Sequence, residues 1–366
     1  MSGAVIEPGI NPGIDPGIDP GNDAGIDAGI DPVLEARARL DPRVVAYIDA
    51  GAGSGSTVSD NVSAWNRWRI RPHVLRDVSV IETDTELFGI RLAAPIFAAP
   101  WAGHALVHPE GEIATARGLR PAGVGFGVSS GASAPIGEVG AASGPFLQQL
   151  YLPEERGLVR GFVERSVAAG AAAILLTVDH PAVGNGFGFR SGLAGLPHRP
   201  LPNFEGVDQS RLGTARTLGP ADIAWLAEAS GVPVLVKGVL RGDDAVVALD
   251  AGAAGIVVSN HGGRQLDGSI TTAEALPEVV EAVAGRAPVL VDGGIRRGED
   301  VVRAIALGAS AVLVGRPFAW ALAGGGSAAV EALATELVTG TRIAMAMVGA
   351  SRLDDLSTDL LRWDTQ

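Results

Sequence analysis

The sequence predicts an α/β fold of the (β/α)8 TIM-barrel type, preceded by an N-terminal helical segment. Between residues 95 and 316, eight short apolar runs rich in β-branched residues alternate with Ala-rich helical stretches. None of the runs shows clean polar alternation, which is typical of parallel strands buried on both faces. Eight successive units favour a closed barrel. A doubly wound open sheet is the alternative, but the Gly-rich dinucleotide turn expected after its first strand is missing.

The first 32 residues precede this pattern. From residue 8 they repeat a four-residue unit, PGIN PGID PGID PGND AGID AGID P. Because Pro and Gly interrupt every unit, neither a helix nor a strand can run through it. We expect residues 1–32 to be a low-complexity, disordered leader rather than a calcium site built from the regular aspartates. Residues 33–366 then form one barrel domain.

The predicted strands follow in order along the chain. They are PIFAAP (95–100), GVGFGVSS (123–130), PFLQQLY (145–151), AAILLTVD (172–179), PVLVKGV (233–239), GIVVSN (255–260), PVLVDGG (288–294) and SAVLVGR (310–316). The clearest helical stretches between them are residues 111–123, 158–171, 221–231, 242–253 and 298–309, several of which have Gly near the C-terminal end.

Polar residues gather where these predicted strands end. Six of the eight ends carry one, and they are Tyr151, Asp179, Lys237, Asn260 with His261, Asp292, and Arg316 after Gly315. In a (β/α)8 barrel the C-terminal ends of the strands meet on the face that carries the active site. We therefore expect these side chains to share one site.

Two segments indicate a phosphate site in the last two loops. In VDGGIRRGEDVV, Gly293 and Gly294 let the backbone approach a ligand, and the helix that follows offers free N–H groups. Arg296 and, in VLVGRP, Arg316 add positive charge. The loops after the seventh and eighth strands are a frequent phosphate site of this fold.

Lys237 is the only lysine of the chain. A lysine at the end of a buried strand needs an anionic or electron-rich partner. It could form a Schiff base, or it could lie against a cofactor that becomes anionic. Its place beside the predicted phosphate site favours the cofactor.

The segment SNHGGRQLDG, residues 259–268, follows the sixth predicted strand. His261 can act as a base near neutral pH, and Arg264 can bind a carboxylate with two hydrogen bonds. Asp179 could orient the imidazole and stabilise its charge. His180 follows Asp179 and could face the same pocket. The other histidines are interpreted as structural or exposed, and no His, Asp or Glu spacing suggests a metal.

The composition excludes other classes of site and partner. The 366 residues contain no cysteine, which excludes disulfides and thiolate metal sites. A net charge of −13 disfavours a nucleic-acid partner. No charge-free apolar run is long enough to span a bilayer, and the N-terminus lacks the pattern of a secretory signal. We expect a soluble, cytoplasmic protein.

With these motifs, the chain resembles the FMN-dependent 2-hydroxy acid oxidases and dehydrogenases, a family that includes glycolate oxidase, lactate oxidase and mandelate dehydrogenase. SNHGGRQLDG is highly specific to that family, and the resemblance covers about residues 40–350. The resemblance implies FMN as cofactor, a small 2-hydroxy acid as substrate, and O2 or another electron acceptor. It also implies a homotetramer. Barrels such as inosinate dehydrogenase need a catalytic cysteine, which this chain lacks.

The resemblance assigns most of the site to FMN. It implies that the residues that contact or hold FMN are Ala98, Ala99, Pro100, Ala102, Ser129, Gln149, Thr177, Lys237, Ser259, Asp292, Gly293, Gly294, Arg296, Gly315 and Arg316. The first of these lie against the flavin ring and the last six hold the ribityl chain and the phosphate. Lys237 would lie next to flavin N1.

The resemblance also assigns the substrate side. It places Tyr47, within VAYIDAGAGS, and Arg264 on the substrate carboxylate, and Tyr151 near the reacting oxygen. His261 would be the base that takes a proton while a hydride or its equivalent passes to flavin N5, and Asp179 would stabilise the imidazolium. Lys237 would stabilise the anionic reduced flavin. The implied reaction converts an (S)-2-hydroxy acid to the 2-oxo acid, with reoxidation by O2 and release of H2O2.

Three departures from the family pattern concern the substrate. Where the family reads TPxxGRR, this chain reads HPAVGNG, so a second substrate arginine is replaced by Gly186, and Arg190 lies four residues on. Gly131 stands where a large side chain is common, and Trp101 where a small one is common. We expect a pocket that is open near Gly131, filled by Trp101, and suited to a substrate bulkier than glycolate. Residues 186–220 are expected to form a mobile lid.

Other functions stay open at this point. A dehydrogenase with a non-oxygen acceptor is one, although Ala102 resembles oxidases. A tailoring oxidase of an amine or a biosynthetic intermediate is another, because the second arginine is missing. A flavin-binding protein without activity is a third, and the presence of His261, Arg264 and Lys237 disfavours it.

Overall fold

The computed structural model describes residues 32–181 and 201–364. The predicted leader, apart from Pro32, lies outside the described residues. So do Gly186, Arg190 and the first part of the predicted lid.

Eight parallel strands close into a barrel in the order β10-β11-β4-β5-β6-β7-β8-β9. The strands are β4 (Ile96–Ala98), β5 (Gly125–Val128), β6 (Phe146–Leu150), β7 (Ala171–Thr177), β8 (Val234–Val239), β9 (Gly255–Val258), β10 (Val289–Val291) and β11 (Ala311–Val314). Each lies within or overlaps one of the eight predicted runs, so the predicted fold class is confirmed. Every residue of β9 is buried, which explains why the run lacks polar alternation.

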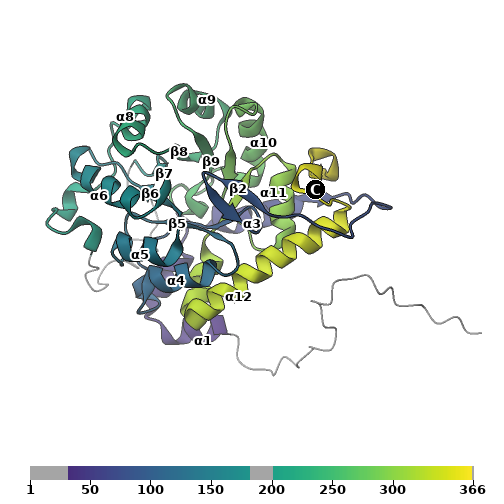
Figure 1. Ribbon diagram of the computed structural model, residues 1–366, viewed down its shortest axis with the longest axis horizontal. Coiled ribbons are helices and arrows are strands. Elements are labelled where there is room, and N and C mark those ends of the chain that lie inside the picture. The colour runs from purple at the N-terminus through teal and green to yellow at the C-terminus, as the bar shows by residue number, and fades with distance from the viewer. Residues whose placement is uncertain (1–31, 182–200, 365–366) are drawn as a thin grey trace, which may run out of the picture.

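Helices surround the barrel (Figure 1). They are α4 (Gly111–Leu119), α5 (Ile136–Ser143), α6 (Gly157–Ala168), α8 (Pro220–Ser230), α9 (Gly242–Asp250), α10 (Thr272–Val283), α11 (Gly298–Ala306) and α12 (Arg316–Val348). Each of the five helical stretches predicted above overlaps one of these helices. The long helix α12 contains a break at Gly325 and Gly326, and it packs against α4 and α11.

The core has two layers. Inside the barrel, apolar side chains such as Phe97, Leu175 and Leu235 form one cluster. The hairpin of β2 (Thr85–Leu87) and β3 (Ile90–Leu92) adds Ile90 and Leu92 to this cluster. Since β3 contacts β5, the hairpin covers the barrel on the side where the strands begin. A larger cluster fills the space between the strands and the helices. The opposite end of the barrel, where the strands end, is the face that carries the active site in this fold.

The predicted N-terminal helical segment is confirmed. It consists of α1 (Pro32–Arg39), α2 (Pro42–Asp49) and α3 (Ser56–Arg67). Helix α1 packs against α12, and α3 contacts the short 3-10 helix η4 (His261–Gly263). Immediately after α3, β1 (Trp68–Ile70) pairs with β12 (Leu361–Trp363) in an antiparallel ribbon. The N-terminal segment therefore reaches the C-terminal face of the barrel.

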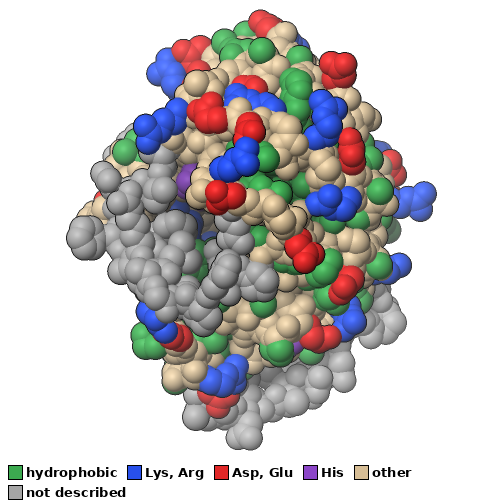
Figure 2. Space-filling view, turned by 90° about the vertical axis from the view of Figure 1, so that its left-hand side faces the viewer, with side chains coloured by type: hydrophobic (Ala, Val, Ile, Leu, Met, Phe, Trp, Pro, Cys, Tyr) green, Lys and Arg blue, Asp and Glu red, His purple; other side chains and the backbone are tan. Residues whose placement is uncertain are grey.

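None of the helices in residues 32–181 and 201–364 is long and apolar enough to cross a membrane. On the face in Figure 2, acidic and basic side chains are interspersed over the described surface. That view shows no large area of one charge sign.

Candidate active site

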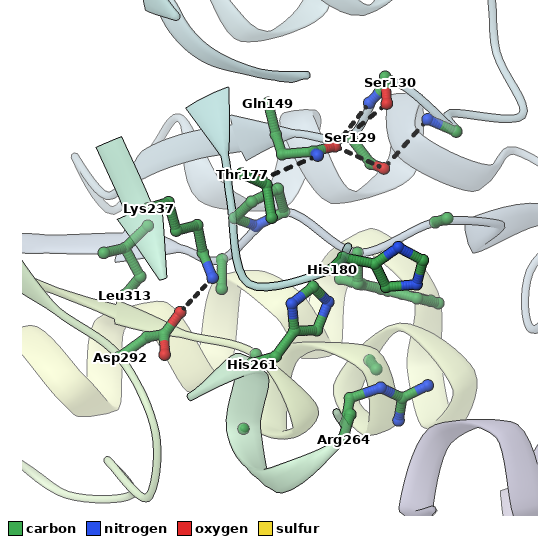
Figure 3. Close-up of a pocket in the computed structure, with 18 of the residues that line it drawn as sticks. Ser129, Ser130, Gln149, Thr177, His180, Lys237, His261, Arg264, Asp292 and Leu313 are labelled. Carbon is green, nitrogen blue, oxygen red and sulfur yellow. Dashed lines mark hydrogen bonds and ion pairs between the residues drawn. The ribbon is translucent and has the colours of Figure 1, made fainter. Parts of the chain in front are cut away.

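One cavity of about 400 Å³ is lined by residues that follow the barrel strands, and it gathers most of the predicted site. Figure 3 shows part of this lining. The predicted site residues that line it are Tyr47, Ala99, Pro100, Trp101, Ala102, Ser129, Gln149, Tyr151, Thr177, Lys237, His261, Arg264, Asp292, Gly293, Gly294, Arg296, Gly315 and Arg316.

Ala98, Asp179 and Ser259 were also predicted for the site, and they lie behind this lining. Ala98 is buried in β4. Asp179 and Ser259 contact His261 and Lys237 from behind. These two residues act on the cavity through the side chains that they hold.

Asp179, His261 and Tyr151 form a continuous chain of polar contacts. His261 Nδ1 lies 2.9 Å from Asp179 Oδ1, and His261 Nε2 lies 3.3 Å from the Tyr151 hydroxyl. Burial opposes ionisation of Asp179, but the neighbouring His261 and Lys237 lower its pKa below the usual value, so it is a carboxylate. A carboxylate only accepts hydrogen bonds, so Nδ1 carries the proton and Nε2 is the acceptor on the cavity side.

Tyr151 is the donor to Nε2 in this chain. Burial and the charge of Asp179 raise the pKa of its hydroxyl well above the usual range, so it keeps its proton. The arrangement therefore presents a basic nitrogen and a hydroxyl donor next to each other, both facing the cavity.

The backbone of the SNHGG segment holds the imidazole in an unusual way. His261, Gly262 and Gly263 have φ values of 59°, 63° and 75°. Left-handed backbone is rare for residues other than glycine, and where it occurs it often marks a functional site. A Cβ on Gly263 would lie 2.8 Å from the backbone nitrogen of Val58. Gly263 thus lets η4 approach α3, and the turn directs His261 towards the cavity.

Asp179 approaches the neighbouring strand at a point where only glycine fits. Gly238 has a φ of 112°, and the pairing of β8 with β9 shifts register there. A Cβ on Gly238 would lie 2.6 Å from the Cβ of Asp179. The sequence VKG thus places Lys237 in the cavity and leaves room for the carboxylate behind His261.

Lys237 is a buried cation with two polar partners. Its Nζ lies 2.8 Å from Asp292 Oδ2 and 2.8 Å from Ser259 Oγ. Burial alone would lower the pKa of Lys237, but the charges of Asp292 and Asp179 raise it above the usual value. The ammonium group is therefore protonated, and Figure 3 shows it directed at Asp292.

Gln149 fixes a polar group on the opposite side. Its Oε1 accepts hydrogen bonds from Ser129 Oγ and from the backbone nitrogen of Ser130, at 3.3 and 3.0 Å. Its Nε2 donates to Thr177 Oγ1 at 3.1 Å. The side chains of three successive strand ends are thus held in one orientation along the cavity wall (Figure 3).

Arg264 and Arg316 lie at the end of the cavity near α2. Both guanidinium groups donate to the backbone carbonyls of Ile48 and Ala50, and Arg316 also donates to Gly262. The Arg264 guanidinium carbon lies 5.1 Å from the centre of the Tyr47 ring. These contacts join the N-terminal segment to the cavity, so Tyr47 reaches arginines that lie more than 200 residues later in the chain.

The cluster of Arg264, Arg296 and Arg316 attracts an anion. Burial and the charges of the other two arginines lower the pKa of Arg316 to about 10. Burial also lowers the pKa of Arg296. Three guanidinium groups this close together favour binding of a carboxylate or phosphate.

Gly293 and Gly294 line the cavity, but their lack of a side chain has another explanation. A Cβ on Gly294 would lie 1.9 Å from the backbone oxygen of Asn61, and one on Gly293 would lie 2.8 Å from Thr272 Oγ1. The two glycines therefore permit close packing of this loop against α3 and α10, in addition to any approach of a ligand.

Two sets of supporting contacts were not predicted from the sequence, although Asn260 itself was expected at the site. Asn61 and Asn260 exchange a pair of amide hydrogen bonds at 2.9 and 2.8 Å, both buried. Asp267 accepts hydrogen bonds from Ser54, Ser56 and Thr57 at the start of α3. Together they hold the SNHGGRQLDG segment against α3 and the loop before it. The only sequence signal for these contacts was the acidic residue Asp267 near the end of SNHGGRQLDG.

The comparisons with known proteins agree with this geometry. A family model described as FMN-dependent dehydrogenase matches residues 36–363. The chain belongs to the FMN-dependent 2-hydroxy acid oxidase and dehydrogenase family. It is an FMN-dependent enzyme that oxidises a 2-hydroxy acid.

Relatives of this enzyme are similar along nearly the whole chain. An L-lactate oxidase from Nostoc sp. is 43% identical over 354 residues, which cover 89% of this chain and 95% of the relative. A glycolate oxidase from Spinacia oleracea is 39% identical over 348 residues, 90% and 94% of the two chains. A solved structure of mandelate oxidase with (S)-2-phenylpropionate has a TM-score of 0.84 at 39% identity and covers 91% and 96%.

The residues present fit FMN. Asp292 Oδ1 is buried and has no hydrogen-bond partner within the described part of the chain, so it can accept from a ribityl hydroxyl. Arg296 and Arg316 suit a phosphate. Lys237 and Gln149 offer donors to the polar edge of a flat ring, and Ala99 offers an apolar surface.

One expectation about the substrate side needs correction. Gly131 lines the cavity, but it does not leave empty space where a side chain would point. A Cβ there would lie 2.9 Å from the Cβ of Ala102. The loop after β5 packs against Ala102, so the absence of a side chain at position 131 is used for close packing. Gly186 and Arg190, the positions that concern the second substrate arginine, lie outside residues 32–181 and 201–364.

Proposed function

We propose that this enzyme oxidises (S)-2-hydroxy acids with side chains larger than that of glycolate, and that dioxygen accepts the electrons. The observation that carries the proposal is the chain from Asp179 through His261 to Tyr151, which presents a base to the same cavity as the buried Lys237. When bound, FMN supplies the acceptor for two electrons from the substrate and passes them to dioxygen.

The residues of the chain do the rest of the chemistry. Arg264 and Tyr47 bind the substrate carboxylate and orient the hydroxyl-bearing carbon. His261 Nε2 accepts a proton from the substrate, and Tyr151 donates a hydrogen bond to the reacting oxygen. Asp179 stabilises the imidazolium that results. Lys237 keeps a positive charge at the cavity, where negative charge develops during electron transfer.

The proposed substrate size rests on the apolar part of the lining. Val159, Leu201, Phe204 and Leu212 line the cavity, and none of them can hydrogen-bond to a small polar acid. The similar solved structures include a mandelate oxidase variant with (S)-mandelic acid, with a TM-score of 0.84 at 38% identity. An aryl or long-chain side chain would make use of this apolar surface.

An absorption spectrum of the purified protein tests the function. We expect visible flavin bands that bleach when (S)-mandelate is added without oxygen, and that return with hydrogen peroxide when air is admitted. Faster bleaching by glycolate than by aryl or long-chain 2-hydroxy acids would contradict the proposed substrate. Return of the bands without peroxide would contradict dioxygen as the natural acceptor and favour a dehydrogenase.

A further inference from the structure

Trp101 is stacked face to face on a histidine outside the proposed machinery. The ring centres of Trp101 and His104 lie 3.8 Å apart, with an angle of 16° between the rings. His104 is only 1% exposed, while Trp101 is half-buried and lines the cavity. Burial lowers the pKa of His104 to about 4, so the imidazole is neutral at physiological pH. One face of the indole is therefore fully occupied inside the protein.

His104 is itself held by α4. Its Nδ1 lies 2.9 Å from Thr115 Oγ1, and its backbone nitrogen donates to Glu112 Oε1 at 3.3 Å. The ring of Phe126, from β5, lies 6.0 Å away on a tilted plane. Because both the ring and the backbone of His104 are fixed, the stack leaves Trp101 little freedom to rotate.

Glu112 joins this unit to the next loop. It is fully buried and also accepts from the backbone nitrogens of Ser133 and Ala134, at 3.0 and 3.1 Å, and from Ser133 Oγ at 2.8 Å. Ser133 Oγ in turn accepts from the backbone nitrogen of Ala105. The loop with Trp101 and the loop with Gly131 are thus bonded to one carboxylate.

The apolar segment on the far side belongs to the same network. Asn203 is buried beside Phe204, and its side chain accepts from the backbone nitrogen of Ile136 at 2.8 Å and donates to the backbone oxygen of Ala134 at 3.1 Å. Three segments that carry Trp101, Gly131 and Phe204 are therefore fixed relative to one another.

We propose that His104 is a positioning residue, which holds Trp101 as a rigid flat wall so that the enzyme selects 2-hydroxy acids with an aryl side chain. The inference rests on the proposed function and adds the residue that sets its side-chain specificity. An immobilised indole can contact an aromatic side chain without losing rotational freedom on binding. Glycolate has no side chain on its hydroxyl-bearing carbon, so it gains nothing from this wall.

The test compares His104→Ala with His104→Phe, using (S)-mandelate and glycolate. We expect His104→Ala to raise KM for (S)-mandelate roughly three- to tenfold with kcat nearly unchanged, while kcat/KM for glycolate stays within about twofold of the native value. His104→Phe keeps a ring under Trp101 and should restore most of the lost affinity. Thr115→Val, which removes only the Nδ1 contact, should give a smaller change of the same kind.

The Kd of phenylacetate, which lacks the reacting hydroxyl, tests the role of His104 without requiring that the enzyme oxidise a 2-hydroxy acid. We expect its Kd to rise in His104→Ala, whether or not the enzyme turns over. If the enzyme oxidises both acids, and neither His104→Ala nor Thr115→Val changes the ratio of kcat/KM for the two acids, the inference about His104 is wrong while the proposed function stands. Equal losses for both acids, without rescue by His104→Phe, would also overturn the inference. A rise in Kd without bleaching by any 2-hydroxy acid would support the role of His104 but contradict the proposed function.

Discussion

At the scale of single residues, the charges of the site depend on pairs that are far apart in the chain. Lys237 and Asp292 are 6% and 9% exposed at their side chains and form an ion pair. A buried pair of this kind contributes little net stability, but removal of one partner leaves a charge without compensation. Replacement of one partner should therefore destabilise the protein more than replacement of both.

We expect Lys237→Met to lower the free energy of unfolding of the protein without FMN by about 3–5 kcal/mol, because Asp292 is left buried and uncompensated. Urea unfolding measures this change. The double variant Lys237→Met with Asp292→Asn is the matched control, and it should recover a large part of the loss. A double variant as unstable as the single one would contradict this account. We also expect both variants to retain less FMN after gel filtration, because Lys237 lines the cavity.

At the scale of elements, the loop before α3 is held by one carboxylate. Asp267 accepts hydrogen bonds from Ser54, then from Thr57 and Ser56, and these contacts hold its pKa far below the usual range. A lowered pKa means that the folded state prefers the ionised form. The stabilisation is therefore fully present above the unfolded pKa of about 3.9, and it is lost as pH falls through the folded value.

We expect Asp267→Asn to lower the Tm at pH 7, and the difference from the native Tm to shrink as pH falls below about 4. Thermal unfolding at a series of pH values measures this. Glu164→Gln, which removes the same charge from an exposed position of α6, is the control and should leave the Tm nearly unchanged at pH 7. A Tm difference for Asp267→Asn that is constant from pH 7 to pH 3 would contradict the pKa argument.

The sequence predicted the strands well because most residues of the barrel strands are apolar, and it predicted that the polar side chains share one cavity because they lie at or near the C-terminal ends of those strands. It did not predict the β2–β3 hairpin, or the pairing of β1 with β12, since strands of three residues give no periodic signal. It also missed Asn61 and Asp267. Their partners become neighbours only after the chain folds, and a lone Asn on a helix has no distinguishing pattern.

At the scale of the whole molecule, the described chain begins with a helix that belongs to the barrel domain. Ala36 of α1 is fully buried, Arg37 pairs with Asp49, and Arg39 donates to the backbone oxygen of Ala323 in α12. We propose that the domain begins at α1 and that the Gly- and Pro-rich repeat before it contributes nothing to its stability.

We expect deletion of residues 1–31 to leave the Tm and the FMN content unchanged, because the repeat lacks the apolar periodicity needed to form a core. Thermal unfolding and the ratio of flavin to protein absorbance measure these quantities. Deletion of residues 1–40 is the control. It removes the contacts of α1 and should lower the Tm. A loss of stability in the shorter deletion equal to that in the longer one would show that the repeat packs on the domain.

The position of the chain's only lysine allows opening of the barrel to be measured by proteolysis. Lys237 lies in β8, which pairs with β7 on one side and β9 on the other, and it is 5% exposed. A protease specific for lysine therefore has one cleavage site, and that site is buried while the barrel is folded. Its rate of cleavage follows the rare opening of the barrel and not the motion of surface loops. Each opening that ends in cleavage would give two fragments, divided at residue 237.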